Sequence, residues 1–257
     1  EQFLGKQFGK EPLYIPGDAD KFSNIFSWQD LNQLMNMTSI WSDKNMRLVL
    51  ESEIIDEERY CSKKLSRDKE TIMRPNFHQV AAFMEQGATL NLNFVESLHD
   101  GIASAARALQ MVFSNFIQCN VYSSWNQRKA FQSHFDSWDV FALHIAGEKV
   151  WRIYENRFDL PATDDGYTAK NMDHDLIEKE KGKLLREVTL TPGDLLYLPK
   201  GVYHDALATT GACLHLTFGV IEIRGYEVIK DIFASSFNDP LFRECLPHLD
   251  ERDQLGE

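Results

Sequence analysis

Apolar and polar positions follow different periods in two parts of this sequence. Between residues 27 and 111 the pattern predicts helices separated by short strands. We expect helices at 28–37, 76–87 and 97–111 and strands at 46–51 and 88–94. Ser27 is a suitable N-cap for the first helix, because its hydroxyl can accept a hydrogen bond from the backbone N–H of Asp30.

Two segments of this first part lack a clear period. Residues 1–20 carry Gly and Pro breaks and are expected to form an irregular lead-in. Residues 52–72 are rich in charge and are expected to be solvated.

From residue 115 the pattern changes to short β-rich runs. These are expected at 115–124, 139–147, 149–155, 184–190, 194–200, 203–209 and 213–223. Gly147, the Pro192-Gly193 pair and Gly201 supply turns between them. Many short strands between such turns are typical of a β-sandwich or barrel. Helical periodicity returns at 226–245.

A polar stretch at 156–182 is long for a hairpin connection. It is expected to be a surface excursion or a lid over a pocket. Its ligand-type residues at 172–175 (MDHD) are interpreted as a solvated loop.

Composition narrows the class of protein. The 257 residues, 43% of them hydrophobic, suit one larger β domain or one domain with a small appendage. A net charge of −12 argues against nucleic acid as the main partner, and it could attract a basic protein or peptide. The four cysteines form no CxxC pair and fit the reduced cysteines of a cytoplasmic protein. No apolar run is long enough for a membrane span, and no signal peptide is evident.

The spacing of three residues indicates a metal site. His134 and Asp136 share one face of an extended segment, because strand side chains alternate with period two. His204, on a distant strand, would complete a set of two imidazoles and one carboxylate. This set is the facial triad of non-heme Fe(II) oxygenases. The alternative is that these are surface or core histidines without a metal.

Four further residues are candidates for the lining of the same pocket. Lys149 begins the strand after Gly147, and a lysine buried beside a metal needs an anion such as the far carboxylate of 2-oxoglutarate. The alternative is a solvated turn lysine. His144 has the parity of the metal pair and could contact the co-substrate or lie in the core. Asn120 and Tyr122 share one face of the preceding strand and could line the pocket or serve packing.

Several segments together resemble the JmjC group of the cupin superfamily, nearest to the bacterial proteins that include the ribosomal oxygenases. They are FLGKQFGKEPLYI, HFDSWDVFALHIAGEKVWRIYE, LTPGDLLYLPKGVYHDA and CLHLTFGV. The resemblance implies a mainly β fold with flanking helices, the double-stranded β-helix or jelly roll. It implies a catalytic domain at 1–225 and a helical segment at 226–257 that resembles the start of a dimerisation region, which suggests a homodimer.

The resemblance also implies roles for individual residues. The Fe(II) ligands would be His134, Asp136 and His204; Lys149 would bind the C5 carboxylate of 2-oxoglutarate, beside Asn120 and His144; Tyr122 and Asn91 would contact the substrate. His144 stands where those oxygenases often have Gln, and Asn91 where some have Arg. The implied activity uses Fe(II), 2-oxoglutarate and O2 to hydroxylate a protein or peptide side chain, with release of succinate and CO2.

Other activities stay open at this point. N-methyl-lysine demethylation or hydroxylation of a small molecule would use the same iron site. A metal-dependent isomerase, or a dioxygenase without 2-oxoglutarate, would leave Lys149 without a role. A non-catalytic cupin binding module is a further alternative, against which the intact triad argues.

Overall fold

A computed structural model describes residues 2–65, 69–125, 132–162, 168–169, 172–209 and 211–245. Their contacts divide the chain into two compact units, Glu1–Ile221 and Glu222–Glu257. The roles of the two predicted domains, 1–225 and 226–257, stay predictions of the sequence.

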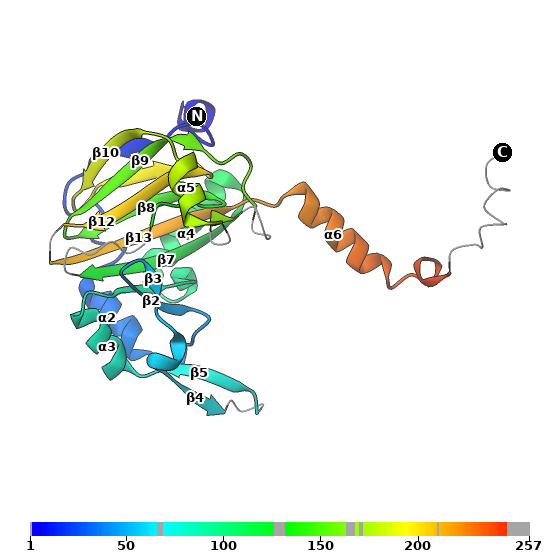
Figure 1. The fold of residues 1–257 in the computed structure, drawn as a ribbon, viewed down its shortest axis with the longest axis horizontal. Helices are drawn as coiled ribbons and strands as arrows, with labels where there is room; N and C mark the ends of the chain where they lie inside the picture. Colours follow the sequence, from blue (N-terminus) through cyan, green and yellow to red (C-terminus); the bar gives the residue numbers. More distant parts are fainter. Residues whose placement is uncertain are drawn as a thin grey trace. The chain divides into compact units, whose positions relative to one another are not determined.

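Two antiparallel sheets form the main part of the first unit in the described residues, beside a separate two-stranded sheet (Figure 1). In the described part of the chain, the larger sheet has eight strands in the order β1-β11-β8-β13-β7-β6-β2-β3. They are β1 (Leu13–Ile15), β2 (Met46–Leu50), β3 (Glu53–Ile54), β6 (Thr89–Leu92), β7 (Phe116–Trp125), β8 (Asp139–Ala146), β11 (Leu195–Leu198) and β13 (Ala212–Ile221). The smaller sheet, in the order β10-β9-β12, holds β9 (Lys149–Arg157), β10 (Leu184–Leu190) and β12 (Val202–Ala208).

Helices flank these sheets, so the predicted fold of strands with flanking helices is confirmed. The helices are α1 (Gln2–Lys6), α2 (Trp28–Asn36), α3 (Phe77–Glu85), α4 (Asp100–Phe113), α5 (His174–Glu180) and α6 (Gly225–Ser236), with 3-10 turns at Glu57–Arg59, Val95–Ser97 and Pro240–Arg243. The predicted cap of α2 is also confirmed, because the Ser27 hydroxyl accepts a hydrogen bond from the Asp30 N–H at 3.3 Å. No helix in the described ranges is long and apolar enough to cross a membrane.

The larger sheet uses its two faces differently. On β7, Ile117, Cys119 and Val121 belong to the main core, which also takes buried residues of α2, α3 and α4. Asn120 and Tyr122 alternate with them and therefore face the other side, toward the smaller sheet. A second, smaller core lies between the sheets. This inner side is where the candidate site residues gather.

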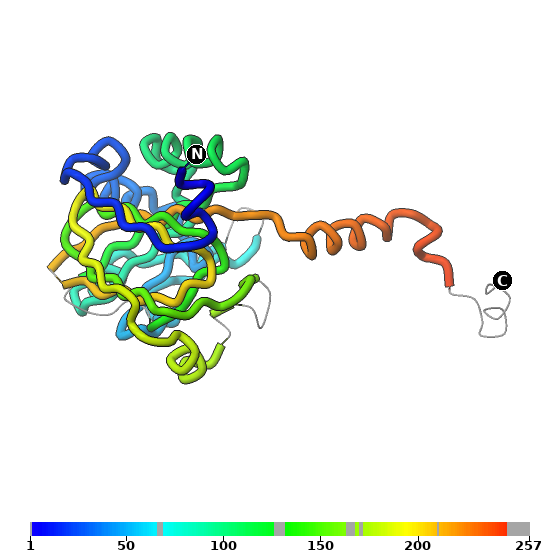
Figure 2. The backbone as a smooth tube through the Cα atoms, turned by 90° about the horizontal axis from the view of Figure 1, so that it is seen from above, coloured from blue at the N-terminus to red at the C-terminus, as the bar shows by residue number. Residues whose placement is uncertain are grey.

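The N-terminal lead-in is more regular than its sequence predicts. It forms α1 and then β1, which pairs with β11 at the edge of the larger sheet. Phe8 stacks on Phe113 at the end of α4, with ring centroids 4.7 Å apart, and Figure 2 shows the two segments side by side. The expectation of an irregular segment was wrong here, because aromatic ring contacts organise residues that have no period of their own.

The charged segments also contain structure that the sequence does not predict. Residues 52–72 include β3 and most of a two-stranded hairpin of β4 (Cys61–Leu65) and β5 (Thr71–Pro75). Tyr60 and Cys61 are buried, while most of the hairpin is exposed as expected. The MDHD motif is not a simple loop either, because Asp173 caps α5 by accepting a hydrogen bond from Asp175 N–H at 2.8 Å.

The second unit is described over α6 and the 3-10 turn that follows. A capping box at Arg224 and Glu227 starts the helix. None of the residues of α6 is buried, and its apolar residues Val228, Ile229, Ile232 and Phe233 are exposed.

Candidate metal centre

The two histidines of the predicted triad lie side by side although they are far apart in the sequence. His134 precedes β8, and it forms an isolated antiparallel bridge with His204 of β12. Each residue donates its backbone N–H to the carbonyl of the other, at 2.9 and 2.8 Å. The carbonyl of Asp136 accepts the N–H of Gly201 at 2.9 Å, which holds this segment to the turn before β12.

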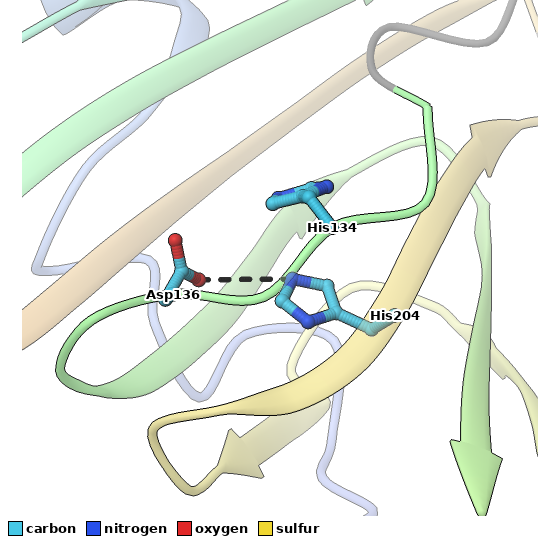
Figure 3. Close-up of side chains that lie close together, drawn as sticks. All are labelled: His134, Asp136 and His204. Atoms are coloured by element: carbon cyan, nitrogen blue, oxygen red, sulfur yellow. Dashed lines mark ion pairs between the residues drawn. The ribbon is translucent and has the colours of Figure 1, made fainter. Parts of the chain in front are cut away.

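The three side chains converge, as Figure 3 shows. One potential ligand atom from each of His134, Asp136 and His204 lies within 4.8 Å of the others. The Asp136 carboxylate is 3.7 Å from Nε2 of His204, and the two imidazole centroids are 4.5 Å apart. Elsewhere in the described ranges, no other three His, Cys, Asp or Glu side chains meet in this way.

Hydrogen bonds select the nitrogen that each histidine presents. Nδ1 of His134 is 2.8 Å from the carbonyl of Gln132, and Nδ1 of His204 is 2.9 Å from the carbonyl of Val202. A carbonyl only accepts, so each Nδ1 is the donor in its hydrogen bond and Nε2 is the nitrogen that each ring can offer to a metal. Burial, with the neighbouring His134, lowers the pKa of His204 to about 4, so this ring is neutral at pH 7. These donors fit a divalent metal held by two imidazoles and one carboxylate.

Lys149 is buried in the interior beside this centre. It is the first residue of β9, only 3% exposed, with its ammonium 6.0 Å from the ring of Trp151. Burial lowers the pKa of Lys149, while the nearby Cys213 thiol opposes the shift. No carboxylate among the described residues pairs with it, so this buried amine suits an anionic ligand that would hold it in the charged form.

A row of polar side chains crosses the inner face of the larger sheet. Cross-strand neighbours place them in the order Arg47, Asn91, Tyr122, His215 and His144, on β2, β6, β7, β13 and β8. This polar row runs from an exposed residue, Arg47, to a fully buried one, His144. Burial and the negative charge of Asp136 both raise the pKa of Tyr122. Because this charge acts over a short range, Tyr122, in the middle of the polar row, lies near the triad.

The deep end of the polar row consists of neutral imidazoles. Burial lowers the pKa of His144 to about 4 and that of His215 well below its usual range. Nε2 of His144 is 3.0 Å from the carbonyl of Gly147, whereas Nδ1 of neither ring has a hydrogen-bond partner in the described structure. Trp151 of β9 joins this end to the metal centre, with its ring centroid 5.7 Å from His204 and 5.8 Å from His215.

The shallow end carries amide and phenol groups. Tyr122 stacks on His215 with centroids 4.8 Å apart, and its phenol is hydrogen-bonded to Asn120. Asn120 also accepts a hydrogen bond from Gln118 at 3.1 Å. Asn91 is 5% exposed, and its Nδ2 has no partner among the described residues.

The structure thus brings the predicted site residues together from both sheets and from the segment before β8, and it adds three. Trp151 could have been found from its alternation with Lys149, and His215 from its place in CLHLTFGV. No sequence signal points to Arg47, because its place beside Asn91 follows only from the pairing of β2 with β6.

Comparison with known sequences identifies a family and several relatives. The sequence profile of the JmjC domain family matches residues 97–228, just over half of the chain. A protein of Culex quinquefasciatus named bifunctional lysine-specific demethylase and histidyl-hydroxylase NO66 is 24% identical over 235 residues, covering 91% of this chain and 34% of its own. Human ribosomal oxygenase 1 is 26% identical over 210 residues, covering 80% and 30%. The chain spans about a third of the length of these relatives.

Comparison of folds leads to similar proteins. A crystal structure of Escherichia coli YcfD has a TM-score of 0.64 at 18% identity, covering 97% of this chain and 60% of that one. YcfD described as a ribosomal oxygenase in complex with cobalt and 2-oxoglutarate has a TM-score of 0.61 at 18% identity, covering 97% and 58%. This likeness confirms the predicted jelly-roll fold.

Proposed function

The chain belongs to the JmjC domain family, and we propose that it is an Fe(II)- and 2-oxoglutarate-dependent oxygenase that hydroxylates a protein or peptide side chain. One observation carries the proposal: two imidazoles and a carboxylate converge, with both Nδ1 atoms held by backbone carbonyls. The cobalt and 2-oxoglutarate complex of YcfD, a protein of the same fold, supports both cofactors.

The residues of the chain have separate tasks in this proposal. His134, Asp136 and His204 would hold the iron through two Nε2 atoms and one carboxylate. Bound iron and 2-oxoglutarate supply the oxidation of a C–H bond by O2, with release of succinate and CO2. Lys149 would bind the far carboxylate of 2-oxoglutarate in a pocket that the protein keeps dry.

The remaining predicted residues divide between the co-substrate and the substrate. His144 at the deep end and Asn120 beside Tyr122 would line the co-substrate pocket. Tyr122 and Asn91 would contact the substrate, because they lead from the triad toward the exposed Arg47.

The names of the relatives, ribosomal oxygenase and histidyl-hydroxylase, support a protein substrate. A basic protein would suit the net charge of −12, which also disfavours nucleic acid. A homodimer would cover the exposed apolar residues of α6, such as Ile232 and Phe233. A cytoplasmic location stays a prediction of the sequence.

Removal of an N-methyl group from lysine is the second candidate activity. The relatives named lysine-specific demethylase support it, and it would use the same metal ligands to oxidise the methyl carbon. Hydroxylation and demethylation differ in product, since demethylation releases formaldehyde.

The test measures succinate release from 2-oxoglutarate by protein loaded with Fe(II) under anaerobic conditions and then exposed to O2. We expect slow turnover by the wild type and none by His134→Ala or Lys149→Ala. Lys183→Ala is the matched control, since Lys183 is exposed. A wild type that binds iron but never consumes 2-oxoglutarate, with Lys149→Ala no different, would overturn the proposal.

A further inference from the structure

The segments that carry the metal ligands have an outer face as well as an inner one. Phe135 lies in the sequence between the ligands His134 and Asp136, and its ring packs in a separate cluster behind them. Tyr203, directly before the third ligand, meets Phe135 edge to face with centroids 5.3 Å apart. Both rings are buried in one small cluster with Ile177 of α5. A helix of the polar insertion therefore packs directly behind the metal ligands.

A chain of hydrogen bonds joins the same three segments. The Lys181 ammonium, which follows α5, donates to Ser133 Oγ at 3.0 Å. Ser133 donates in turn to the Asp205 carboxylate at 2.9 Å, and the Tyr154 hydroxyl donates to the same oxygen at 2.7 Å. Ser133 directly precedes one histidine ligand, and Asp205 directly follows the other. The network thus ties the two ligand-bearing segments to each other and to α5.

Lys181 is well placed to hold this network. Its side chain is only 13% exposed, lies 2.6 Å from the Glu178 carboxylate, and covers the ring of Tyr154 at 4.1 Å. Burial acts to lower the pKa of Lys181, but the hydrogen bonds to Glu178 and Tyr154 outweigh it and raise the pKa. The lysine is therefore charged at neutral pH, and hydrogen bonds from a charged donor are stronger than those between neutral groups.

We propose that Lys181 is a positioning residue, which through Ser133 and Asp205 sets the placement of the two histidine ligands. This inference rests on one part of the proposed function, namely that His134, Asp136 and His204 bind a metal. Residues behind metal ligands orient them, and their loss commonly weakens metal affinity 10- to 100-fold. Because Lys181 belongs to the insertion, any partner that displaces α5 would also change the metal centre.

The experiment compares Co(II) binding to metal-free wild type and variants without 2-oxoglutarate. Lys181→Met keeps the bulk of the side chain and removes the ammonium. We expect its Co(II) affinity to fall about 10-fold and the visible absorption bands of bound Co(II) to change shape. Lys181→Arg should restore part of the affinity. Lys179→Met is the matched control on the exposed side of the same helix and should behave as the wild type.

Several outcomes would overturn the proposal. The proposal fails if Lys181→Met binds Co(II) with wild-type affinity and an unchanged absorption spectrum. It also fails if Lys179→Met loses as much Co(II) affinity as Lys181→Met. If Lys181→Met fails to fold, Tyr154→Phe decides, because it removes one hydrogen bond and keeps the ring. An unchanged affinity and spectrum in Tyr154→Phe would then overturn it. If the wild type binds Co(II) but never consumes 2-oxoglutarate, only the proposed function is contradicted. The comparison of Co(II) affinities between wild type and Lys181→Met still tests the role of Lys181.

Discussion

The two ends of the polar row differ in burial and in charge, and the metal triad lies between them. At the deep end, His215 and His144 are almost fully buried, and Lys149 lies close enough to lower the pKa of both rings. At the shallow end, Tyr122 is half-buried and Arg47 is exposed. A buried and largely neutral pocket suits a small ligand of constant shape, whereas an open end can accept part of a macromolecule. The same sheet therefore has a buried end and an open end on either side of the triad, which is the basis for the proposed division between co-substrate and substrate.

The strongest way to test this comparison is to remove the deep cation. Lys149→Met should weaken 2-oxoglutarate binding by about 100-fold, because loss of one partner of a buried charge pair costs about 2–5 kcal/mol. Isothermal titration calorimetry of the Mn(II)-loaded protein with 2-oxoglutarate measures the dissociation constant. Lys149→Arg keeps the charge and should lose less. If wild type and Lys149→Met bind 2-oxoglutarate with equal affinity, the deep end is not the binding site of the co-substrate.

The acid stability of the metal-free protein tests whether the deep imidazoles are neutral. The pKa of His144 falls from 6.5 to about 4 on folding. The unfolded chain then binds more protons between these values, so stability is full above pH 6.5 and is lost as the pH falls toward 4. His144 should account for about 2 kcal/mol of the loss between pH 7 and pH 5. Urea unfolding at both pH values should show a smaller loss in His144→Gln.

The matched variant for this measurement is His78→Gln, since His78 is exposed. It should keep the full pH dependence of the wild type. If His144→Gln loses as much stability on acidification as His78→Gln, the deep end does not hold a neutral histidine.

The smallest effect is expected at the shallow end. Asn91→Ala removes one hydrogen-bond donor, worth about 1 kcal/mol, so KM for a peptide substrate should rise about 5-fold. The affinity for 2-oxoglutarate should stay unchanged in the same variant, which provides an internal control. A large loss of 2-oxoglutarate affinity in Asn91→Ala would show that the two ends are not separate.

Much of the candidate site could be predicted because its residues lie in short sequence patterns that can be recognised without knowledge of the fold. His134 and Asp136 share a face by the period of a strand, and Lys149 follows a glycine turn. Period two predicts which face a side chain takes, but it does not predict which strand lies alongside. The neighbours Arg47 and Asn91 meet only through the register of β2 with β6.

The same limit applies to the elements that the sequence did not predict. The strand β1 is three residues long and exists because β11 offers it an edge. The helix α5 is short and charged, and Ile177 is its one buried residue. Lys181 looks like an ordinary solvated lysine in the sequence, and only the fold brings it to Ser133. Such contacts depend on tertiary pairing, which a single sequence does not encode locally.

The backbone bridge between His134 and His204 has a consequence for how iron would enter the protein. Bringing His134 and His204 together closes a long chain segment, which costs conformational entropy. The two backbone hydrogen bonds of the bridge offset this cost without a metal. In small zinc domains the metal itself drives folding, so removal of the metal unfolds them. In this chain the donors would be assembled before any ion arrives. Chelators should therefore strip the centre reversibly, and metal exchange should proceed at the rate of ion dissociation rather than of refolding.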